Sequence, residues 1–366
     1  MTTTAPAGTT SSADITREEL QLAARNHGMP LEAMRYDVTP VGLHYLLIHY
    51  DIPPIDGDQW SLEIDGAVGA PARLSLDDLR GREAVTRPVT MECAGNGRAQ
   101  LSPRALSQPW LVEAVGTGAW TGTPLWPLLE AVGLADDVVD IVFTGADRGV
   151  EGGVEQHYQR SLTPTQVRHE EALLVYELNG APLPPQHGFP LRLLVPGWYG
   201  MTSVKWLSRI TAVTEWFGGY QQANAYRFKH DPDDEGRPVT RMHVRSLMVP
   251  PGVPDFYTRR RLLRPEPVVL SGRAWSGAGT IVRVEVSTDG GVTWDDADLD
   301  PPADMYVWQG WRADWVAEQG DHLLMCRATD SGGLTQPLEP DWNLGGYAVN
   351  AAHRIPVTVS AAPADG

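Results

Sequence analysis

Cysteine is almost absent from this sequence. Cys93 and Cys326 are the only two cysteines among 366 residues. Two cysteines so far apart could pair with each other, but they cannot form the disulfide framework of a small disulfide-stabilised domain. Stability must therefore come from ordinary hydrophobic cores.

Long apolar runs and an excess of basic charge are also lacking. No run approaches the length needed to span a membrane, and the N-terminal segment shows no basic n-region, apolar h-region or twin-arginine motif. Net charge is −17, from 29 basic and 46 acidic residues. This balance disfavours unspecific binding to nucleic acid or anionic membranes. The sequence predicts a cytoplasmic protein with neither partner.

The length predicts two domains, because 366 residues exceed what one ordinary core accommodates. The 37 Gly, 30 Pro and 13 Trp indicate many turns and a mixed or β-rich fold. Composition and patterning divide the chain into four segments. They are a partly disordered extension over 1–35, an α+β domain over 36–225, a linker over 226–265 and a β-sandwich over 266–360.

The first domain alternates helical and strand patterns. Thr16 and Glu19 form a capping box before a helix over 17–28, and Ser75 caps a helix within 74–81. A third helix over 124–134 ends near Gly133. Strands are predicted over 42–56, 59–68, 89–93, 139–147, 172–180 and 189–197.

The second domain has short alternating strands and no helical pattern. A hairpin over 280–294 places Val282, Val284 and Val286 on one side and reverses at the turn 289–291. Leu324, Cys326 and Ala328 share one face of another strand. These features predict an immunoglobulin-like sandwich in which Cys326 is an inert core residue.

Cys93 has a different position. It ends a strand in "VTMECAGNGRAQ", residues 89–100, directly before a glycine-rich turn that closes on Arg98. Such a thiol suits a metal ligand or a nucleophile, and a half-buried structural cysteine is the alternative. The residues alone leave these options open.

Four motifs in order resemble the sulfite oxidase family of molybdopterin-dependent oxidoreductases. They are "ECAGNGR", "LNGAPLPPQHGFPLRLLVPGWYGMTSVKWLSRI", "AWSGAGTIVRVEVSTDGGVTW" and "WNLGGYAVNAAHRIPV". The resemblance covers nearly the whole chain after about residue 36. Within the family, the chain is similar to the bacterial, haem-free type. It implies a mixed α+β molybdopterin-binding domain followed by an immunoglobulin-like dimerisation domain.

The resemblance gives four residues catalytic positions. Cys93 would ligate molybdenum as a thiolate, and Arg98 would point into an anion pocket. Tyr226, which lies 21 residues beyond Lys205, matches the family's active-site tyrosine. Trp120 matches a pocket-wall tryptophan. Plain packing remains the alternative for both aromatic residues.

A further set of positions would hold the pterin cofactor, which carries a phosphate and a polar ring system. Besides Cys93, the matching residues are His49, Asp147, His187, Arg192, Ser203 and Lys205. A turn role is equally plausible for Asp147.

Several usual pocket arginines are replaced. Leu47 stands two residues before His49, Thr280 follows "WSGAG", and Met201-Thr202 replaces a pair that commonly includes arginine. Arg98 is then the only pocket arginine expected. A dianion held by fewer cations binds more weakly, which weakens the sulfite assignment while leaving the cofactor assignment intact.

The resemblance implies oxygen-atom transfer at one molybdopterin-bound molybdenum per chain, with sulfite oxidised to sulfate in a homodimer. Because no Cys-x-x-Cys-His motif occurs, we expect no haem and a separate electron acceptor. One alternative is reduction of nitrate or an S- or N-oxide on the same fold. Others are a hydrolase using Cys93 with His49 or His187, and a non-catalytic binding protein.

Overall fold

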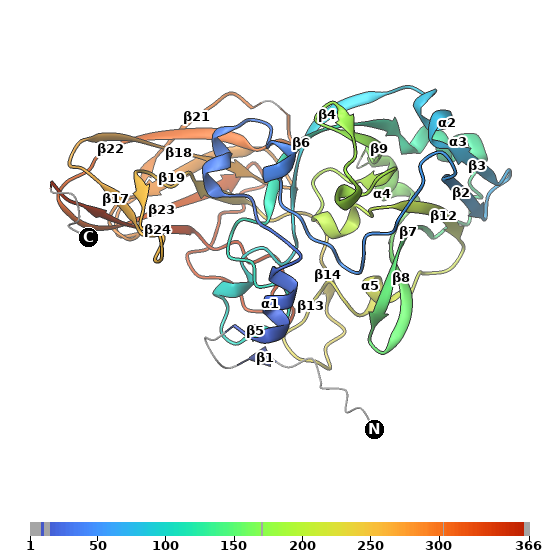
Figure 1. Cartoon of the computed structure of the whole chain (residues 1–366), viewed down its shortest axis with the longest axis horizontal. Coiled ribbons are helices and arrows are strands. Elements are labelled where there is room, and N and C mark those ends of the chain that lie inside the picture. The colour runs from blue at the N-terminus through green and yellow to red at the C-terminus, as the bar shows by residue number, and fades with distance from the viewer. Residues whose placement is uncertain (1–8, 11–14, 170, 303, 362–366) are drawn as a thin grey trace.

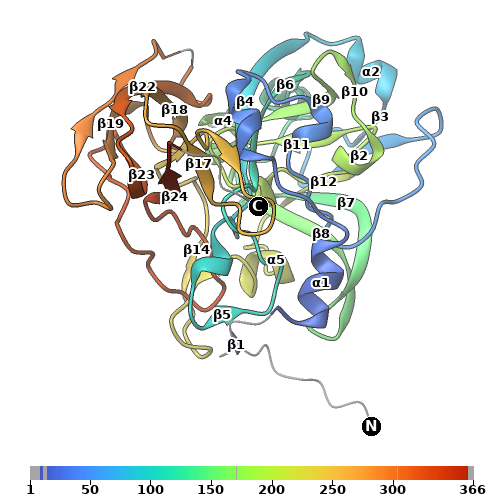
Figure 2. The same cartoon turned by 60° about the vertical axis from the view of Figure 1, so that its left-hand side comes forward.

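The computed structural model describes residues 9–10, 15–169, 171–302 and 304–361. Two bodies lie side by side, the first domain at the right of Figure 1 and the second, orange to red, at the left. The same separation is visible after rotation (Figure 2). The arrangement confirms the predicted fold class, an α+β domain followed by a β-sandwich.

Two five-stranded sheets form the first domain. One has the order β10-β9-β6-β4, with β11 paired to β9, and the other has the order β3-β2-β12-β7-β8. The first contains β4 (Val85–Glu92), β6 (Val115–Pro124), β9 (Leu173–Leu178), β10 (Ala181–Pro182) and β11 (Arg192–Leu194). The second contains β2 (Ser61–Gly66), β3 (Ala72–Ser75), β7 (Asp140–Glu151), β8 (Val154–Leu162) and β12 (Leu207–Val213). Only β2 and β12 run parallel among these pairs.

Short helices and turns connect these strands. The α-helices are α1 (Arg17–Ala23), α2 (Leu76–Arg80), α3 (Leu125–Val132), α4 (Pro164–His169) and α5 (Tyr220–Ala223). The 3-10 helices are η1 (Leu31–Arg35), η2 (Val41–Leu43), η3 (Arg98–Gln100), η4 (Pro185–His187) and η5 (Gly200–Thr202). Small two-stranded pairs join β1 (Thr9–Thr10) to β5 (Arg104–Ala105) and β13 (Arg227–Phe228) to β14 (Arg237–Pro238).

The helix caps follow the sequence. Thr16 and Ser75 form the capping boxes of α1 and α2, and Gly133 ends α3 at a φ of 70°. These predictions are confirmed, although α1 stops at Ala23, short of Gly28. No helix in the described ranges is long and apolar enough to cross a membrane.

The strand predicted over residues 42–56 is wrong. All of these residues are described, and they form only η2, an isolated bridge between Leu46 and His27, and irregular chain. Backbone groups of this segment form hydrogen bonds to partners that are not in a sheet. For example, the Ile48 N–H donates to the Asn26 side chain at 2.7 Å. The segment follows an irregular path along the functional site, where both Leu47 and His49 line the cavities described below.

The second domain is a sandwich of a four-stranded and a six-stranded sheet. The first contains β15 (Arg245–Met248), β18 (Pro267–Trp275), β22 (Gln309–Val316) and β21 (Asp298–Leu299). The second contains β16 (Val253–Pro254), β17 (Arg261–Leu263), β24 (His353–Val359), β23 (Gly320–Asp330), β19 (Ile281–Ser287) and β20 (Asp295–Asp296). Leu324, Cys326 and Ala328 are all fully buried, as predicted for one core face.

Two details differ from the sequence reading. Val282 is 55% exposed while Val284 and Val286 are buried, because a register shift between Ile281 and Arg283 turns Val282 outward. The sheets also begin inside the predicted linker, with β15, β16 and β17. Prolines around residues 250–254 keep these strands short and mask their alternation.

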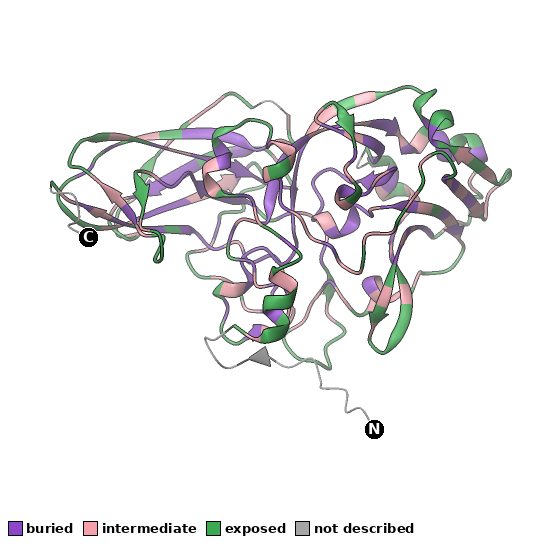
Figure 3. Cartoon of the chain, in the orientation of Figure 1, coloured by how far each residue is buried: buried purple, intermediate pink, exposed green. Residues whose placement is uncertain are grey.

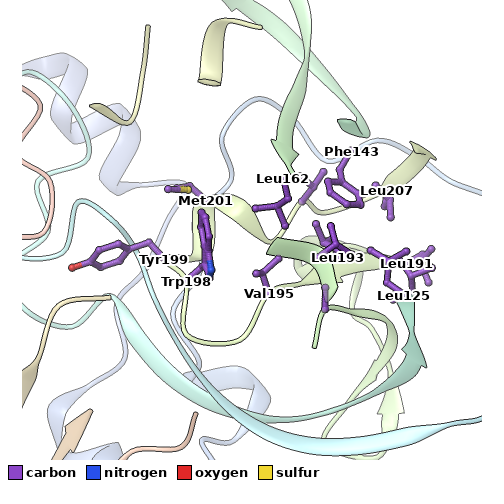
Figure 4. Packing of buried hydrophobic residues seen from close by; sticks show 14 of the residues in the cluster. Leu125, Phe143, Leu162, Leu191, Leu193, Val195, Trp198, Tyr199, Met201 and Leu207 are labelled. Carbon is purple, nitrogen blue, oxygen red and sulfur yellow. The ribbon is translucent and has the colours of Figure 1, made fainter. Parts of the chain in front are cut away.

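The buried residues run through both bodies and across their boundary (Figure 3). The largest cluster packs first-domain residues such as Leu125, Phe143 and Leu193 (Figure 4) and also contains Leu247 and Trp275 from the second domain. Because the two domains share this core, the second domain fixes the position of first-domain loops at the interface.

Candidate active site

Cys93 directly follows β4 and is held on both sides. Its backbone N–H donates to the Ala114 carbonyl at 2.9 Å, and its own carbonyl accepts from the Asn96 N–H at 3.0 Å. The side chain is 8% exposed and lines two adjoining cavities. Burial raises the pKa of the Cys93 thiol. A thiolate therefore forms here at ordinary pH only with a cationic partner such as a metal.

Glycines after Cys93 allow close approaches that a side chain would prevent. A Cβ on Gly95 would lie 2.6 Å from the Arg98 guanidinium, and a Cβ on Gly97, whose φ is 95°, would lie 2.5 Å from the Val349 carbonyl. The Ala348 N–H also donates to the Ala94 carbonyl at 2.8 Å. The loop over 93–98 is therefore seated directly on the second domain.

A buried polar network anchors the residue before Cys93. The Glu92 carboxylate accepts hydrogen bonds from Arg245, from Trp275 Nε1 at 2.9 Å and from Asn96 Nδ2 at 3.0 Å. Glu92 and Arg245 are each 1% exposed. Asn96 Oδ1 accepts from the Ala114 N–H at 3.0 Å, which ties the network back to the strand beside Cys93. Two residues of the sandwich thus fix the end of β4.

The first cavity, here called the inner pocket, gathers residues from loops far apart in sequence. It brings together all seven predicted cofactor-binding residues. These are His49, Cys93, Asp147, His187, Arg192, Ser203 and Lys205. His44, Tyr45 and Met91 also line it and were not predicted from the sequence.

The inner pocket holds two cations whose partners are mainly backbone carbonyls. Arg192 donates to the carbonyls of His187 at 3.2 Å and Ser203 at 3.1 Å, and Lys205 Nζ donates to the Leu47 carbonyl at 2.7 Å. Burial lowers the pKa of Arg192 to about 10. Burial, and then the charge of Arg192, lower the pKa of Lys205 to about 7. Neutral carbonyls satisfy the N–H groups without balancing the charge, and the Asp147 carboxyl offsets the charge of Lys205 only in part.

The remaining titratable groups share this imbalance. Burial lowers the pKa of His187 to about 2 and that of His44 to about 4, and it raises the pKa of Asp147 to about 6. His44 Nε2 and Arg192 Nε are buried without a hydrogen-bond partner among the described residues. A bound anion with polar ring groups would supply the missing negative charge, an acceptor for Arg192 Nε and a donor for His44 Nε2, since His44 Nδ1 bonds to the Tyr45 carbonyl. The inner pocket therefore fits a phosphate-bearing pterin.

The second cavity, here called the outer pocket, shares Leu47, His49, Cys93 and Tyr226 with the inner one. Arg98 lines it, donating from Nε to the Gly345 carbonyl at 2.9 Å and from Nη1 to the Gln108 carbonyl at 3.1 Å. Cys93 thus lies where the two cavities meet. This is the position that a protein ligand to a metal between cofactor and substrate requires.

Three of the predicted site residues have surroundings that the sequence did not predict. Trp120 is fully buried and lines neither pocket; its ring lies 5.1 Å from the Arg192 guanidinium, so it supports that side chain from behind. His49 Nε2 bonds to the Glu151 carboxylate at 2.9 Å. Tyr226 adopts a φ of 47°, and burial raises the pKa of its hydroxyl well above the usual value.

The residues that replace the usual pocket arginines do not all lie at the site. Leu47 lines both pockets and Met201 lines the inner one, whereas Thr280 lines neither. Sequence reasoning missed Tyr347, Gln108 and Glu151 in the outer pocket. Tyr347 lies in the motif attributed to the second domain, so its position gave no sign of an active-site role.

No group of three or more His, Cys, Asp or Glu side chains is arranged to hold a metal ion in the described part of the chain. Most of a metal's ligands at Cys93 would therefore have to come from a cofactor. With the two-domain fold, this arrangement agrees with the class of molybdopterin-binding oxidoreductases.

Comparison with known proteins identifies the family. Residues 49–221 match the oxidoreductase molybdopterin binding domain, and residues 237–360 match the Mo-co oxidoreductase dimerisation domain. The chain is 34% identical over 347 residues to mitochondrial sulfite oxidase of Homo sapiens, which covers 88% of this chain and 62% of the relative. It is 31% identical over 353 residues to NAD(P)H nitrate reductase of Hordeum vulgare, with 88% and 39% covered.

A solved structure of another protein has a similar fold. The crystal structure of the sulfane dehydrogenase SoxCD from Paracoccus pantotrophus matches with a TM-score of 0.78 and 26% identity, covering 92% of this chain and 86% of that chain. The chain is also 32% identical over 344 residues to sulfite oxidase of Gallus gallus, which covers 87% of this chain and 72% of that relative. It belongs to the sulfite oxidase family of molybdopterin-dependent oxidoreductases. It spans 62% of the length of the human relative.

The Glu92–Arg245 pair yields a stability prediction. Arg245→Met leaves a buried carboxylate without its cation, so we expect the free energy of unfolding in urea to fall by about 3–5 kcal/mol. Adding Glu92→Gln should recover much of this loss, because the amide oxygen still accepts from Trp275. Arg354→Met is the control: its partner Glu339 is 80% exposed, and a change within about 1 kcal/mol is expected. Equal losses in both arginine variants would contradict the buried-pair account.

Lys205 yields a pH prediction for cofactor-free protein. Its folded pKa of about 7 lies below its ordinary value of 10.5, so the unfolded chain binds more protons between these values. The free energy of unfolding therefore rises with pH in this window. We expect a gain on the order of 1 kcal/mol from pH 7 to 8.5 in urea unfolding, and a flatter profile in Lys205→Met. A flat wild-type profile would show that the ammonium is not destabilised by burial.

Proposed function

We propose that this protein oxidises sulfite to sulfate by oxygen-atom transfer and passes the electrons to a separate acceptor. The observation that carries the proposal is the position of Cys93, between an inner pocket rich in unbalanced cations and an outer pocket that presents Arg98. Relatives with sulfite oxidase activity in their names support the same substrate.

The residues of the inner pocket would hold the cofactor. Arg192 and Lys205 would balance its anionic groups, and His44, His187 and Ser203 would contact its polar atoms. Cys93 would be the single protein ligand to molybdenum. When bound, the molybdenum cofactor supplies the two-electron oxygen-atom transfer chemistry.

The outer pocket would bind and orient the substrate. Arg98 is held by two carbonyls and by the ring of Tyr347, 5.3 Å from its guanidinium carbon, so its charge is fixed before an oxyanion arrives. The Tyr226 hydroxyl keeps its proton because burial raises its pKa, and it can therefore donate a hydrogen bond to an oxyanion. Both groups would be preorganised hydrogen-bond donors to an oxyanion.

A second candidate reaction is the reduction of nitrate or of an S- or N-oxide. The observation that favours it is the charge of the outer pocket, where Glu151 and Leu47 lie with Arg98. A carboxylate and an aliphatic side chain disfavour a dianion more than a monoanion or a neutral oxide. Plant nitrate reductases among the relatives support this reading.

A cysteine-nucleophile hydrolase is the weakest candidate. A nucleophilic thiol needs a hydrogen-bonded base or a lowered pKa. No hydrogen bond joins Cys93 to His49, His187 or any other histidine of the described chain, and burial raises the pKa of the thiol. A non-catalytic binding protein would share the fold, and measurements of molybdenum and turnover exclude or establish it.

The match to a dimerisation domain supports a homodimer as the proposed assembly. The cytoplasm is the proposed compartment, because Cys93 and Cys326 are both free thiols, as a reducing environment keeps them. The electron acceptor is proposed as a separate protein or small molecule.

The two cysteines provide a matched test of the metal site. Wild-type protein from a cofactor-competent host should contain about one molybdenum per chain by elemental analysis. Cys93→Ser should lose turnover by at least about a hundredfold, since a hydroxyl is a poor substitute for a thiolate ligand. Cys326→Ser, in the sandwich core, should keep both molybdenum and turnover. Wild-type protein without metal or pterin would refute the proposal.

The substrate is tested on molybdenum-loaded enzyme. Steady-state assays would use sulfite with ferricyanide as acceptor, and nitrate or a sulfoxide with reduced viologen as donor. We expect sulfite turnover to be the faster. Nitrate or sulfoxide reduction without sulfite oxidation would select the second candidate.

A further inference from the structure

Arg160, on β8, is a buried cation directly behind the active-site wall. It is 2% exposed, and its Nη1 donates to the carbonyl of Gln221. Its guanidinium carbon lies 5.7 Å from the centre of the Tyr226 ring. Its Nε is buried and has no hydrogen-bond partner among the described residues. Nothing in the sequence motifs distinguished this arginine.

No carboxylate pairs with Arg160 in the described part of the chain. The electrostatic partners that favour its charged form are the hydroxyls of Tyr158, Tyr226 and Tyr347, and burial lowers its pKa. A fully buried guanidinium with only neutral partners is unusual, because desolvation costs several kcal/mol unless an anion offsets it. The neighbourhood is therefore complete only when a negative charge lies within reach.

The aromatic residues around Arg160 show where that charge would lie. Tyr226 lines both pockets, and Tyr347 lines the outer one. Their ring centres are 5.3 Å apart, and Arg98 lies over the far ring at 5.3 Å. The four side chains form a row of guanidinium, two phenol rings and guanidinium. Each end carries a positive charge, and the tyrosines between them face the outer pocket.

We propose that Arg160 is a positioning residue for an oxyanion substrate, supplying through Tyr226 and Tyr347 the second positive charge that the pocket lacks at Leu47. A cation against a phenol ring polarises the hydroxyl toward stronger hydrogen-bond donation and adds to the positive potential of the pocket. The two guanidiniums together match a doubly charged oxyanion such as sulfite or sulfate better than Arg98 alone. The proposal rests on the proposed function for its substrate.

The cofactor is the other anion that could complete Arg160. The substrate is favoured because the row of rings ends on Arg98, which lines the outer pocket only. The inner pocket has its own cations, Arg192 and Lys205. The two sources predict different variants: loss of a cofactor contact lowers molybdenum content, whereas loss of a substrate contact raises KM.

The test compares Arg160→Met and Arg160→Lys with wild type as molybdenum-loaded enzyme. We expect normal molybdenum content in both variants. In Arg160→Met, KM for sulfite and the inhibition constant of sulfate should each rise about tenfold or more, with a smaller change in kcat. Arg160→Lys should recover part of this loss, because it keeps the charge. Arg209→Met is the control, since Arg209 is half-exposed and pairs with Glu63 and Asp65.

A readout independent of turnover separates this proposal from the proposed function. The rise in Tm on adding sulfate should be large in wild type and small in Arg160→Met, and the monoanion nitrate should show less difference. If wild type does not oxidise sulfite but shows this pattern, the proposed function fails and the role of Arg160 stands. Unchanged KM and an unchanged sulfate shift in fully loaded Arg160→Met would overturn the inference. Failure of both variants to hold molybdenum or to fold would also overturn it, assigning Arg160 to the cofactor or to the fold.

Discussion

The ion pair between Glu92 and Arg245 is the contact on which the site's geometry depends. It joins the last residue of β4 to the first residue of β15, so the strand leading to Cys93 ends on the second domain. Trp275 and Asn96 complete the carboxylate's hydrogen bonds, which makes the burial of this charge tolerable. The contacts of Ala94 with Ala348 and of Gly97 with Val349, both in the same domain, then leave the loop little freedom.

The site also concentrates positive charge that the folded chain does not neutralise. Arg192 and Lys205 face the inner pocket, Arg98 faces the outer one, and Arg160 lies behind the shared wall. The proposed function, with an anionic cofactor and an anionic substrate, would use this positive charge, which lowers the stability of the empty protein. The net negative charge of the chain does not remove this local excess, because salt screens exposed acidic residues that lie more than about 10 Å away.

Features that depend on residues close together in the sequence could be predicted, whereas features that depend on contacts between distant segments could not. Caps at Thr16 and Ser75 and the core face of Cys326 rest on local spacing, so they could be read directly. The seven inner-pocket residues were found through motif positions, and the fold then brought them together. Arg160 and the Glu92–Arg245 pair could not be predicted, because each depends on contacts between segments more than 50 residues apart. The strand prediction over 42–56 was wrong because its apolar residues do not share one face of a sheet. Leu46, Leu47 and Ile48 line the pockets, whereas Leu43 and Ile55 pack against the core.

The shared boundary between the domains has a consequence for how the protein is made. Gly345 and Ala348, which contact Arg98 and Ala94, lie near the end of the described chain. Synthesis must therefore pass residue 348 before the loop around Cys93 can make these contacts. Cofactor insertion would then follow the folding of the second domain, so that cofactor content reports whether that domain has folded. A chain that lacks residues 345–348 would lack the contacts that shape this loop.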